Sequence, residues 1–231
     1  QPSLLYPSAG WLNPAGFVRT LFEYHQPEWI SDTVKRMTIV QDKASNPSWN
    51  IVGTHAEYTT ARVVLAAGHH SAELIDTPLK IKPVKGQISM VRASAETAQL
   101  TTVLCYKGYM VPAQQGEHCI GATFERDQAD LSSSSTADEA NCESLANCAQ
   151  QAWSKDLTVT GHRVSVRATT PDHQPAAGLL QPGLMLFSGL GSRGLTSAPV
   201  LAELLAEQLS GGIVPLTKDA RSRVQPQRLM T

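Results

Sequence analysis

Residues 184–209 constrain the fold of this chain more than any other stretch. Four apolar residues come first, and glycines follow at Gly189, Gly191 and Gly194 before a second apolar run begins. A short apolar run bounded by glycine is typical of a buried strand. The stretch therefore predicts a strand that ends in a glycine turn.

A helix is predicted directly after this turn. Its apolar residues recur three and four positions apart, as on one face of a helix: Val200, Leu201, Leu204, Leu205 and Leu209. We expect Thr196 or Ser197 to cap the helix, and Pro199 is suited to its first turn.

The glycine turn is a candidate anion site. Glycines let backbone N–H groups approach a ligand closely, and the N-terminus of the following helix carries roughly half a positive charge. The spacing of Gly189, Gly191 and Gly194 also fits the dinucleotide fingerprint G-x-G-x-x-G. A tight turn before a surface helix is the alternative interpretation.

A nucleotide-binding module that starts at this fingerprint is disfavoured. Such a unit needs a second strand with an acidic residue about 20 positions beyond the glycines. Here Gly211 and Gly212 end the helix, a short apolar run follows at 213–215, and the tail is polar and basic. The motif is therefore expected at the end of a nucleotide-binding domain.

The composition indicates a globular protein. At 231 residues, with 42% hydrophobic and 17% charged residues, the chain suits one or two domains. A net charge of -1 provides no whole-chain attraction to nucleic acid, although Arg221, Arg223 and Arg228 give the tail a candidate phosphate contact. We expect neither a membrane helix, which needs about 18 apolar residues in a row, nor a signal peptide, and hence a cytoplasmic protein.

No metal site is expected. The four cysteines lack C-x-x-C spacing, which favours free thiols over a zinc site or a disulfide framework. His69 and His70 are consecutive, and consecutive side chains at the end of a strand are expected to point in opposite directions.

Two kinds of secondary-structure pattern alternate along the chain: helices with single strands, and runs of antiparallel strands. The first part predicts a helix that opens at Asn13-Pro14 and a strand at Val63–Leu65 that is buried on both faces. Between about residues 83 and 123, apolar runs separated by turns predict antiparallel strands. A helix at 137–153 and a strand at 157–166 are expected next.

This order of predicted helices and strands indicates a fold of the α/β (α+β) class. Residues 167–178, with two prolines, are expected to form an ordered loop. Residues 1–80 and 171–231 would form a partial nucleotide-binding domain, interrupted by an antiparallel-sheet substrate domain at 81–170.

Five stretches stand in a distinctive order along the chain. They are Ala66-Ala67-Gly68, LKIKPVKGQI, GYMVPAQQGEHCIGATFE, VRATTPDHQPAAG and FSGLGSRGLTSAP. In this order they resemble the landmarks of the D-amino-acid oxidase-like family of FAD-dependent amine oxidoreductases. Within that family, YPSAGWLNPAGFVRTL and GLGSRGLTSAP are most similar to the branch that acts on the wobble uridine of tRNA as one half of a bifunctional enzyme.

The resemblance implies FAD as the cofactor and oxidation of a C–N bond to an imine that hydrolyses. The expected substrate is a carboxymethylaminomethyl-(2-thio)uridine in tRNA, which would lose its carboxymethyl group as glyoxylate. A small amine, as in glycine and sarcosine oxidases, is the alternative substrate. A non-catalytic fragment without bound FAD is a third interpretation.

The resemblance also implies missing parts. Such enzymes open with a βαβ unit whose glycine fingerprint holds the FAD pyrophosphate, and no such unit precedes Gln1. We therefore expect an incomplete FAD-binding Rossmann-like domain in the C-terminal portion of a longer protein. The absent partners would be the N-terminal FAD-binding part and a methyltransferase part.

Arg167 and Tyr109 are the candidate catalytic residues. A planar guanidinium binds a carboxylate through two parallel hydrogen bonds, and by resemblance Arg167 matches the carboxylate-binding arginine of related amine oxidases. A strand-end arginine paired with Asp172 is the alternative. Tyr109 matches a tyrosine that lines the substrate cavity in the glycine oxidase branch, whereas a packing role is the alternative.

The candidate cofactor-binding residues also follow from the resemblance. Positions in the glycine turn would lie near the pyrimidine end of the flavin, the small residues after the 63–65 strand near the pyrophosphate, and one backbone near the adenine. These residues are Val34, Ala67, Gly68, Gly189, Gly191, Ser192, Arg193 and Gly194. By resemblance, Lys85-Gly86-Gln87 matches a further family element near the flavin, where Gly86 would allow a close approach of the backbone.

Overall fold

The computed structural model describes residues 3–40 and 47–230, which fall into two compact units. The first unit comprises residues 1–27, 85–125 and 130–165, and the second comprises residues 28–84, 126–129 and 166–231. The described residues form the following helices: α1 (Pro14–His25), α2 (Ser135–Ala149), α3 (Gly194–Ser210) and α4 (Lys218–Val224), with 3-10 helices η1 (Gly68–Ala72), η2 (Thr97–Gln99), η3 (Ala152–Ser154), η4 (Gly191–Arg193) and η5 (Pro226–Leu229).

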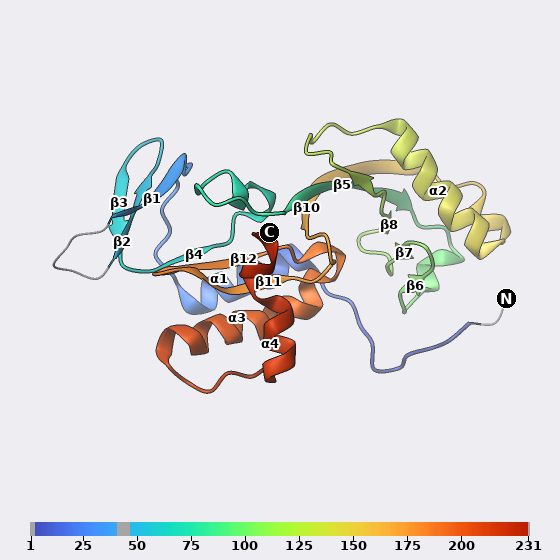
Figure 1. The fold of residues 1–231 in the computed structure, drawn as a ribbon. Coiled ribbons are helices and arrows are strands. Elements are labelled where there is room, and N and C mark those ends of the chain that lie inside the picture. Colours follow the sequence, from blue (N-terminus) through green and yellow to red (C-terminus); the bar gives the residue numbers. More distant parts are fainter. Residues whose placement is uncertain (1–2, 41–46, 231) are drawn as a thin grey trace. The chain divides into compact units, whose positions relative to one another are not determined.

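The strands belong to three sheets (Figure 1). They are β1 (Arg36–Val40), β2 (Ser48–Val52), β3 (Glu57–Thr60), β4 (Val63–Leu65), β5 (Lys82–Arg92), β6 (Leu104–Cys105), β7 (Tyr109–Met110), β8 (Glu117–Gly121), β9 (Glu125–Arg126), β10 (Val159–Thr169), β11 (Ala176–Gln181) and β12 (Leu184–Ser188). The predicted mixture of helices with antiparallel sheet is confirmed, whereas the predicted domain boundaries stay a prediction.

Helix α1 begins where the sequence predicts. The side chain of Asn13 accepts a hydrogen bond from the N–H of Gly16 at 3.1 Å, and Pro14 occupies the first turn. Capping side chains and proline both favour a helix start at this point. None of the residues of α1 is buried.

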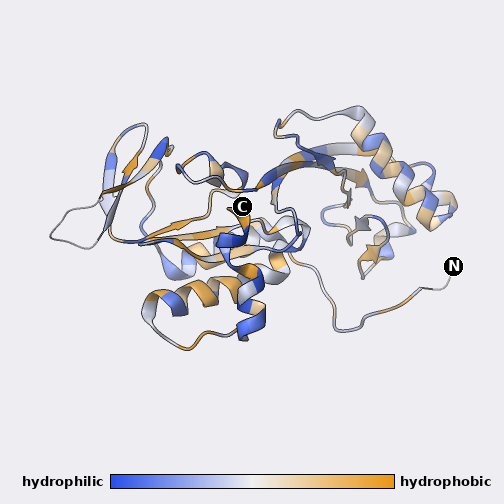
Figure 2. Ribbon diagram, viewed as in Figure 1, coloured by the Kyte–Doolittle hydropathy of each residue, from blue (hydrophilic) through white to orange (hydrophobic). Residues whose placement is uncertain are grey.

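A three-stranded sheet forms the centre of the second unit, with the strand order β11-β12-β4. Strand β12 pairs with β11 antiparallel and with β4 parallel. Leu65, Leu184 and Leu186 face one apolar cluster, while Ala177 and Met185 pack with α3 on the other face. Figure 2 shows β12 in hydrophobic colours, while α3 alternates between hydrophobic and hydrophilic residues.

The prediction that the 63–65 strand is buried on both faces is wrong. Val64 is 43% exposed, whereas Leu65 is buried. The reason is the position of β4 at the end of its sheet, where β12 is its one partner among the described strands. A strand at a sheet edge is covered less completely than a central strand.

The predicted loop at 167–178 is wrong at both ends. The stretch 167–178 is not a loop throughout, since Arg167 lies in β10 and β11 begins at Ala176. Strand β11 contains two alanines and Gly178 where β-branched residues are typical. Its strand conformation comes from pairing with β12, which a local pattern does not reveal.

The first unit contains the predicted antiparallel strands. Strands β5, β8, β7 and β6 pair antiparallel in this order, and α2 packs on one face through an apolar cluster that includes Met110 and Leu145. The predicted helix at 137–153 divides into α2 and η3. Within the region 83–123, where antiparallel strands are predicted, the apolar run at 101–106 forms a strand only at β6.

The end of the chain is helical, and two of its basic side chains form ion pairs. In the described part of the chain no strand follows α3. The tail is not a free basic arm: Arg223 pairs with Asp219, and the Arg228 side chain, only 19% exposed, pairs with Asp172 at 2.7 Å. Within the described ranges, no helix is both long and apolar enough to cross a bilayer.

The Arg228–Asp172 pair ties η5 to the loop before β11. The guanidinium also donates to the carbonyl oxygens of Gln174, Pro175 and Gln225. Desolvation raises the pKa of Asp172, but hydrogen bonds from Arg228 and Gln174 outweigh it and lower this pKa to about 2.

We predict that Arg228→Ala lowers the free energy of unfolding by about 1–3 kcal/mol, because it removes charge-assisted hydrogen bonds. The native pKa of Asp172 lies below its unfolded value, so this contribution is present above about pH 4 and is lost as the pH falls toward 2. Urea unfolding at pH 7 and at pH 3 measures both effects. Arg223→Ala is the control, because its ion pair is exposed; equal losses for the two variants would contradict the assignment.

Candidate functional site

Two glycine turns lie at the same edge of the β11-β12-β4 sheet. Strands β4 and β12 run parallel, with Leu65 opposite Leu186, so their carboxyl ends lie side by side. Gly68 follows β4 and Gly189 follows β12. Ligands of open α/β sheets bind at the carboxyl ends of the strands, which makes this edge the candidate site.

The glycines of these turns adopt the left-handed conformation. The φ angles are +60° at Gly68, +68° at Gly189 and +57° at Gly191. A Cβ atom at Gly68 would meet nothing within 4 Å, and one at Gly191 would meet only Thr169 Cγ2, at 4.0 Å. The backbone is thus open to a ligand at Gly68 and Gly191, and N–H groups at these turns fit the electron-rich groups of a dinucleotide cofactor such as FAD.

The start of α3 differs from the sequence prediction. The helix begins at Gly194 directly after η4, and neither Thr196 nor Ser197 caps it. Ser197 lies inside the helix, and its hydroxyl donates back to the carbonyl of Arg193 at 3.3 Å. Because the tight glycine turn leads straight into the helix, no side chain caps the N–H groups of the first turn, which leaves them available to an anion.

Ser188 is a site residue that the sequence analysis missed. Its hydroxyl donates a hydrogen bond to the carbonyl oxygen of Gly68 at 2.8 Å. The two residues are 120 positions apart, and a serine between apolar residues and glycine carries no local signal of this contact. The parallel pairing of β4 and β12 is what brings them together.

His69 and His70 correct a further expectation. Their rings do not point apart but lie 3.9 Å from each other between centroids, because the chain turns into η1 at Gly68. Burial, and next the neighbouring His70, lower the pKa of His69, although Glu73 opposes the change. His69 is therefore a neutral imidazole at neutral pH and adds no positive charge beside the turn.

The predicted cofactor residues all lie in the second unit. Ala67, Gly68 and the residues of the 189–194 turn meet at the sheet edge described above. Val34 precedes β1, and both Val34 and Ala67 pack against the apolar cluster on one face of this sheet. The structure thus gathers the two turns and links Val34 to them through a shared core.

The two predicted catalytic residues lie in different compact units. Tyr109 belongs to the first unit, where Met110 packs toward α2 and the alternation of the strand turns Tyr109 to the opposite face. On that face burial raises the pKa of the Cys119 thiol, and a hydrogen bond with Tyr109 opposes the increase. Arg167 lies in the part of β10 that belongs to the second unit, and the Asp172 carboxylate is bonded to Arg228.

Lys85 and Gln87 are buried under the segment that leads into α2. The ammonium of Lys85 lies 2.6 Å from Asp130, and this bond lowers the pKa of Asp130 to about 2. Gln87 donates to Asp138 at 2.8 Å and to the carbonyl of Ser134. These contacts give both residues a structural role in fixing α2 on its sheet.

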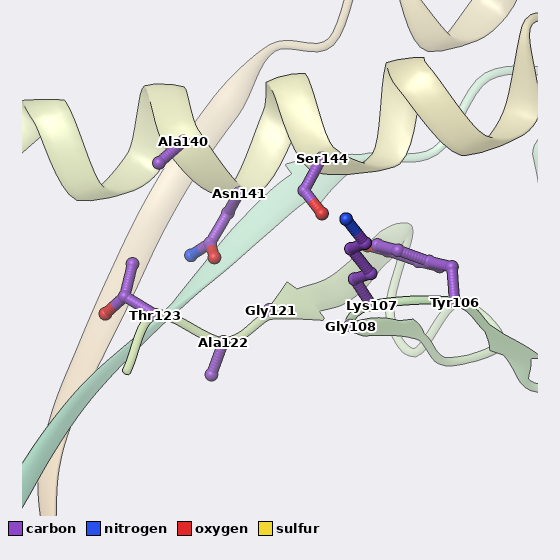
Figure 3. Close-up of a pocket in the computed structure, with 9 residues that line it drawn as sticks. All are labelled: Tyr106, Lys107, Gly108, Gly121, Ala122, Thr123, Ala140, Asn141 and Ser144. Carbon is purple, nitrogen blue, oxygen red and sulfur yellow. The ribbon is translucent and has the colours of Figure 1, made fainter. Parts of the chain in front are cut away.

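A pocket of about 200 Å³ lies within the first unit, between α2 and the end of β8 (Figure 3). None of the predicted site residues lines it. Its lining residues are Tyr106, Lys107, Gly108, Gly121, Ala122, Thr123, Ala140, Asn141 and Ser144. The pocket lies in the first unit, and the glycine turns belong to the second.

Comparison with known proteins gives one family. The family model of FAD-dependent oxidoreductases (DAO) matches residues 2–208. Among curated relatives, the tRNA 5-methylaminomethyl-2-thiouridine biosynthesis bifunctional protein of Idiomarina loihiensis is 46% identical over 98% of this chain, and that of Aeromonas hydrophila is 35% identical over 96%. The chain spans only 38% of the length of each of these relatives.

Solved structures show the same fold. Glycine oxidase from Geobacillus kaustophilus matches with a TM-score of 0.70 and 22% identity, over 82% of this chain and 50% of the oxidase. Iminodiacetate oxidase from Chelativorans matches with a TM-score of 0.67 and 21% identity, over 83% of this chain and 52% of that enzyme.

Alanine substitution at the two left-handed glycines Gly189 and Gly211 should lower stability by different amounts. Both have positive φ, so alanine at either costs about 1–2 kcal/mol. At Gly189 the new Cβ would also lie 2.5 Å from Thr170 Cγ2, whereas at Gly211 it meets nothing within 4 Å. We predict that Gly189→Ala lowers the free energy of unfolding by about 1–3 kcal/mol more than Gly211→Ala.

Urea unfolding of the two variants checks this contrast. Thr170→Ser removes the clashing methyl group but keeps the hydroxyl that donates to Gln174, and it should rescue part of the loss at Gly189. Equal stability of the Gly189→Ala and Gly211→Ala variants would show that the turn is more open than described.

Proposed function

Because the chain belongs to the DAO family of FAD-dependent oxidoreductases, we propose that it forms part of an enzyme that oxidatively removes the carboxymethyl group from carboxymethylaminomethyl-(2-thio)uridine at the wobble position of tRNA. The observation that carries the proposal is the pair of open glycine turns at the carboxyl ends of two parallel strands. The tRNA substrate is favoured by the names of the curated relatives, at up to 46% identity. An enzyme with this substrate would act in the cytoplasm.

The cofactor would be held by the second unit. The N–H groups of the turn at Gly189, Gly191, Ser192, Arg193 and Gly194, together with the uncapped start of α3, provide positive potential for the pyrimidine end of the flavin. Ala67 and Gly68 allow a close approach of the pyrophosphate, and the backbone at Val34 would meet the adenine. When bound, FAD would supply the oxidation of the substrate C–N bond to an imine, whose hydrolysis yields glyoxylate and the aminomethyl group.

The open edge of β4 is where the rest of the cofactor domain would attach. Strand β4 has one neighbour among the described strands, and Val64 leaves apolar surface exposed beside it. Parallel sheets are normally covered, and a further parallel strand at this edge would extend the row of carboxyl ends. We propose that a nucleotide-binding unit, within the length by which the relatives exceed this chain, supplies that strand.

Substrate binding would depend on Arg167 and Tyr109. The guanidinium of Arg167 can bind the substrate carboxylate through two parallel hydrogen bonds and so fix the carbon between the carboxylate and the amine. Tyr109 lies on the face of its sheet that is turned away from α2, and its hydroxyl would donate a hydrogen bond to the substrate carboxylate. These roles need no ionised side chain other than the guanidinium.

A small-molecule amine oxidase is the second candidate function. It is favoured by the fold shared with glycine oxidase and iminodiacetate oxidase, both named for small carboxylated amines. The same arginine would then bind the carboxylate of the free amino acid. The two functions differ in the substrate that reduces the flavin.

We predict that Arg167→Ala in the full-length protein leaves FAD bound but slows flavin reduction by a carboxylated amine at least about 100-fold, a loss of about 3 kcal/mol. Arg167→Lys keeps the charge but not the paired hydrogen bonds, so only partial activity should return. Arg36→Ala, an exposed arginine of β1, is the control and should reduce normally. Stopped-flow absorbance without oxygen measures the rates.

The substrate that reduces the flavin distinguishes the tRNA-modifying enzyme from the small-molecule amine oxidase. Undermodified tRNA should reduce the wild-type flavin rapidly, and free glycine or sarcosine slowly. Reduction by glycine alone would favour the amine oxidase, and unchanged reduction in Arg167→Ala would remove this residue from the substrate role. If the full-length protein binds no FAD, both enzymatic functions would be excluded and the non-catalytic interpretation would be favoured.

A further inference from the structure

Ser188 joins the two glycine turns of the candidate site. The last ladder pair of β4 and β12 is Leu65 with Leu186, so this pairing no longer joins the two strands where the turns begin, although β11 still pairs with β12 at Ser188. Two residues farther on, the hydroxyl of Ser188 donates to the carbonyl of Gly68 at 2.8 Å. The Ser188 residue is 2% exposed, so the bond is shielded from water.

The Ser188–Gly68 hydrogen bond lies between two turns whose glycines have high conformational freedom. Gly68 and Gly189 both occupy the left-handed region, and glycine has more accessible conformations than any other residue. Beyond Leu65 no ladder pair joins the turn after β4 to β12, so without another link that turn could shift relative to the turn after β12. A buried hydrogen bond to the carbonyl of Gly68 holds that turn at a fixed distance from the start of the other.

We propose that Ser188 is a positioning residue for the cofactor, which rests on the proposed function of the two turns in FAD binding. The N–H groups of both turns must meet one ligand at the same time. The Ser188–Gly68 bond holds them in that arrangement before the ligand arrives, so less ordering is required on binding. Ser188 does not itself touch the cofactor in this account; it acts through Gly68.

The chain offers a matched control in Ser154. This serine is also 2% exposed, and its hydroxyl also donates to a backbone carbonyl, that of Gln151, at 2.8 Å. It lies in the first unit, whereas Ser188 lies in the second. Ser188→Ala and Ser154→Ala thus remove the same kind of bond, and only the first removes it from the glycine turns.

The experiment measures FAD affinity and stability of both variants in the full-length protein. After removal of the cofactor, titration with FAD followed by flavin fluorescence gives Kd, and urea unfolding gives the stability. We expect similar losses of stability, with Kd raised about 5–10-fold in Ser188→Ala and unchanged in Ser154→Ala. Equal Kd values for the two variants would overturn the proposal.

A second pair of variants covers the case in which alanine at position 188 prevents folding. Ser188→Thr and Ser188→Val add nearly the same volume, but only threonine keeps the hydroxyl. We expect Ser188→Thr to bind FAD more tightly than Ser188→Val does. Equal Kd values for these two variants would overturn the proposal. A wild-type protein that binds no FAD overturns the proposed function as well, whereas equal binding by all variants overturns only the role of Ser188.

Discussion

The parallel pairing of β4 with β12 is the constraint on which the candidate site depends. It brings residues that are about 120 positions apart in the chain to one sheet edge, where both strands end in left-handed glycines. The same pairing places α3 so that its uncapped N-terminus follows the second turn. No single segment of the sequence forms this site, since each turn alone is an ordinary glycine turn.

Local patterns in the sequence predicted what local physics controls. The helix start at Asn13-Pro14, the glycine turn at 189–194 and the antiparallel strands after residue 83 all follow from neighbouring residues. Strand β11 was missed because its alanines and Gly178 gain strand conformation only from β12. The Ser188–Gly68 bond and the exposure of Val64 were missed for a similar reason: both follow from the sheet order, which no periodicity encodes.

The structure brings the predicted cofactor residues into one unit, whereas the predicted substrate residues lie in two. Family resemblance indicated both sets of residues, and the cofactor set lies together in one compact unit. Tyr109 and Arg167 lie in different units, so their joint action depends on an arrangement that neither unit determines alone. Lys85 and Gln87 show the opposite case, since their side chains are occupied in holding α2.

The central claim is that the two glycine turns hold FAD together. Hydrogen–deuterium exchange of the full-length protein with and without FAD tests it most directly, because backbone N–H groups that hydrogen-bond to a bound ligand exchange slowly. The account predicts that FAD slows exchange at residues 67–70 and at residues 189–195 at the same time. Bound FAD with protection at neither turn, or at only one of them, would contradict it.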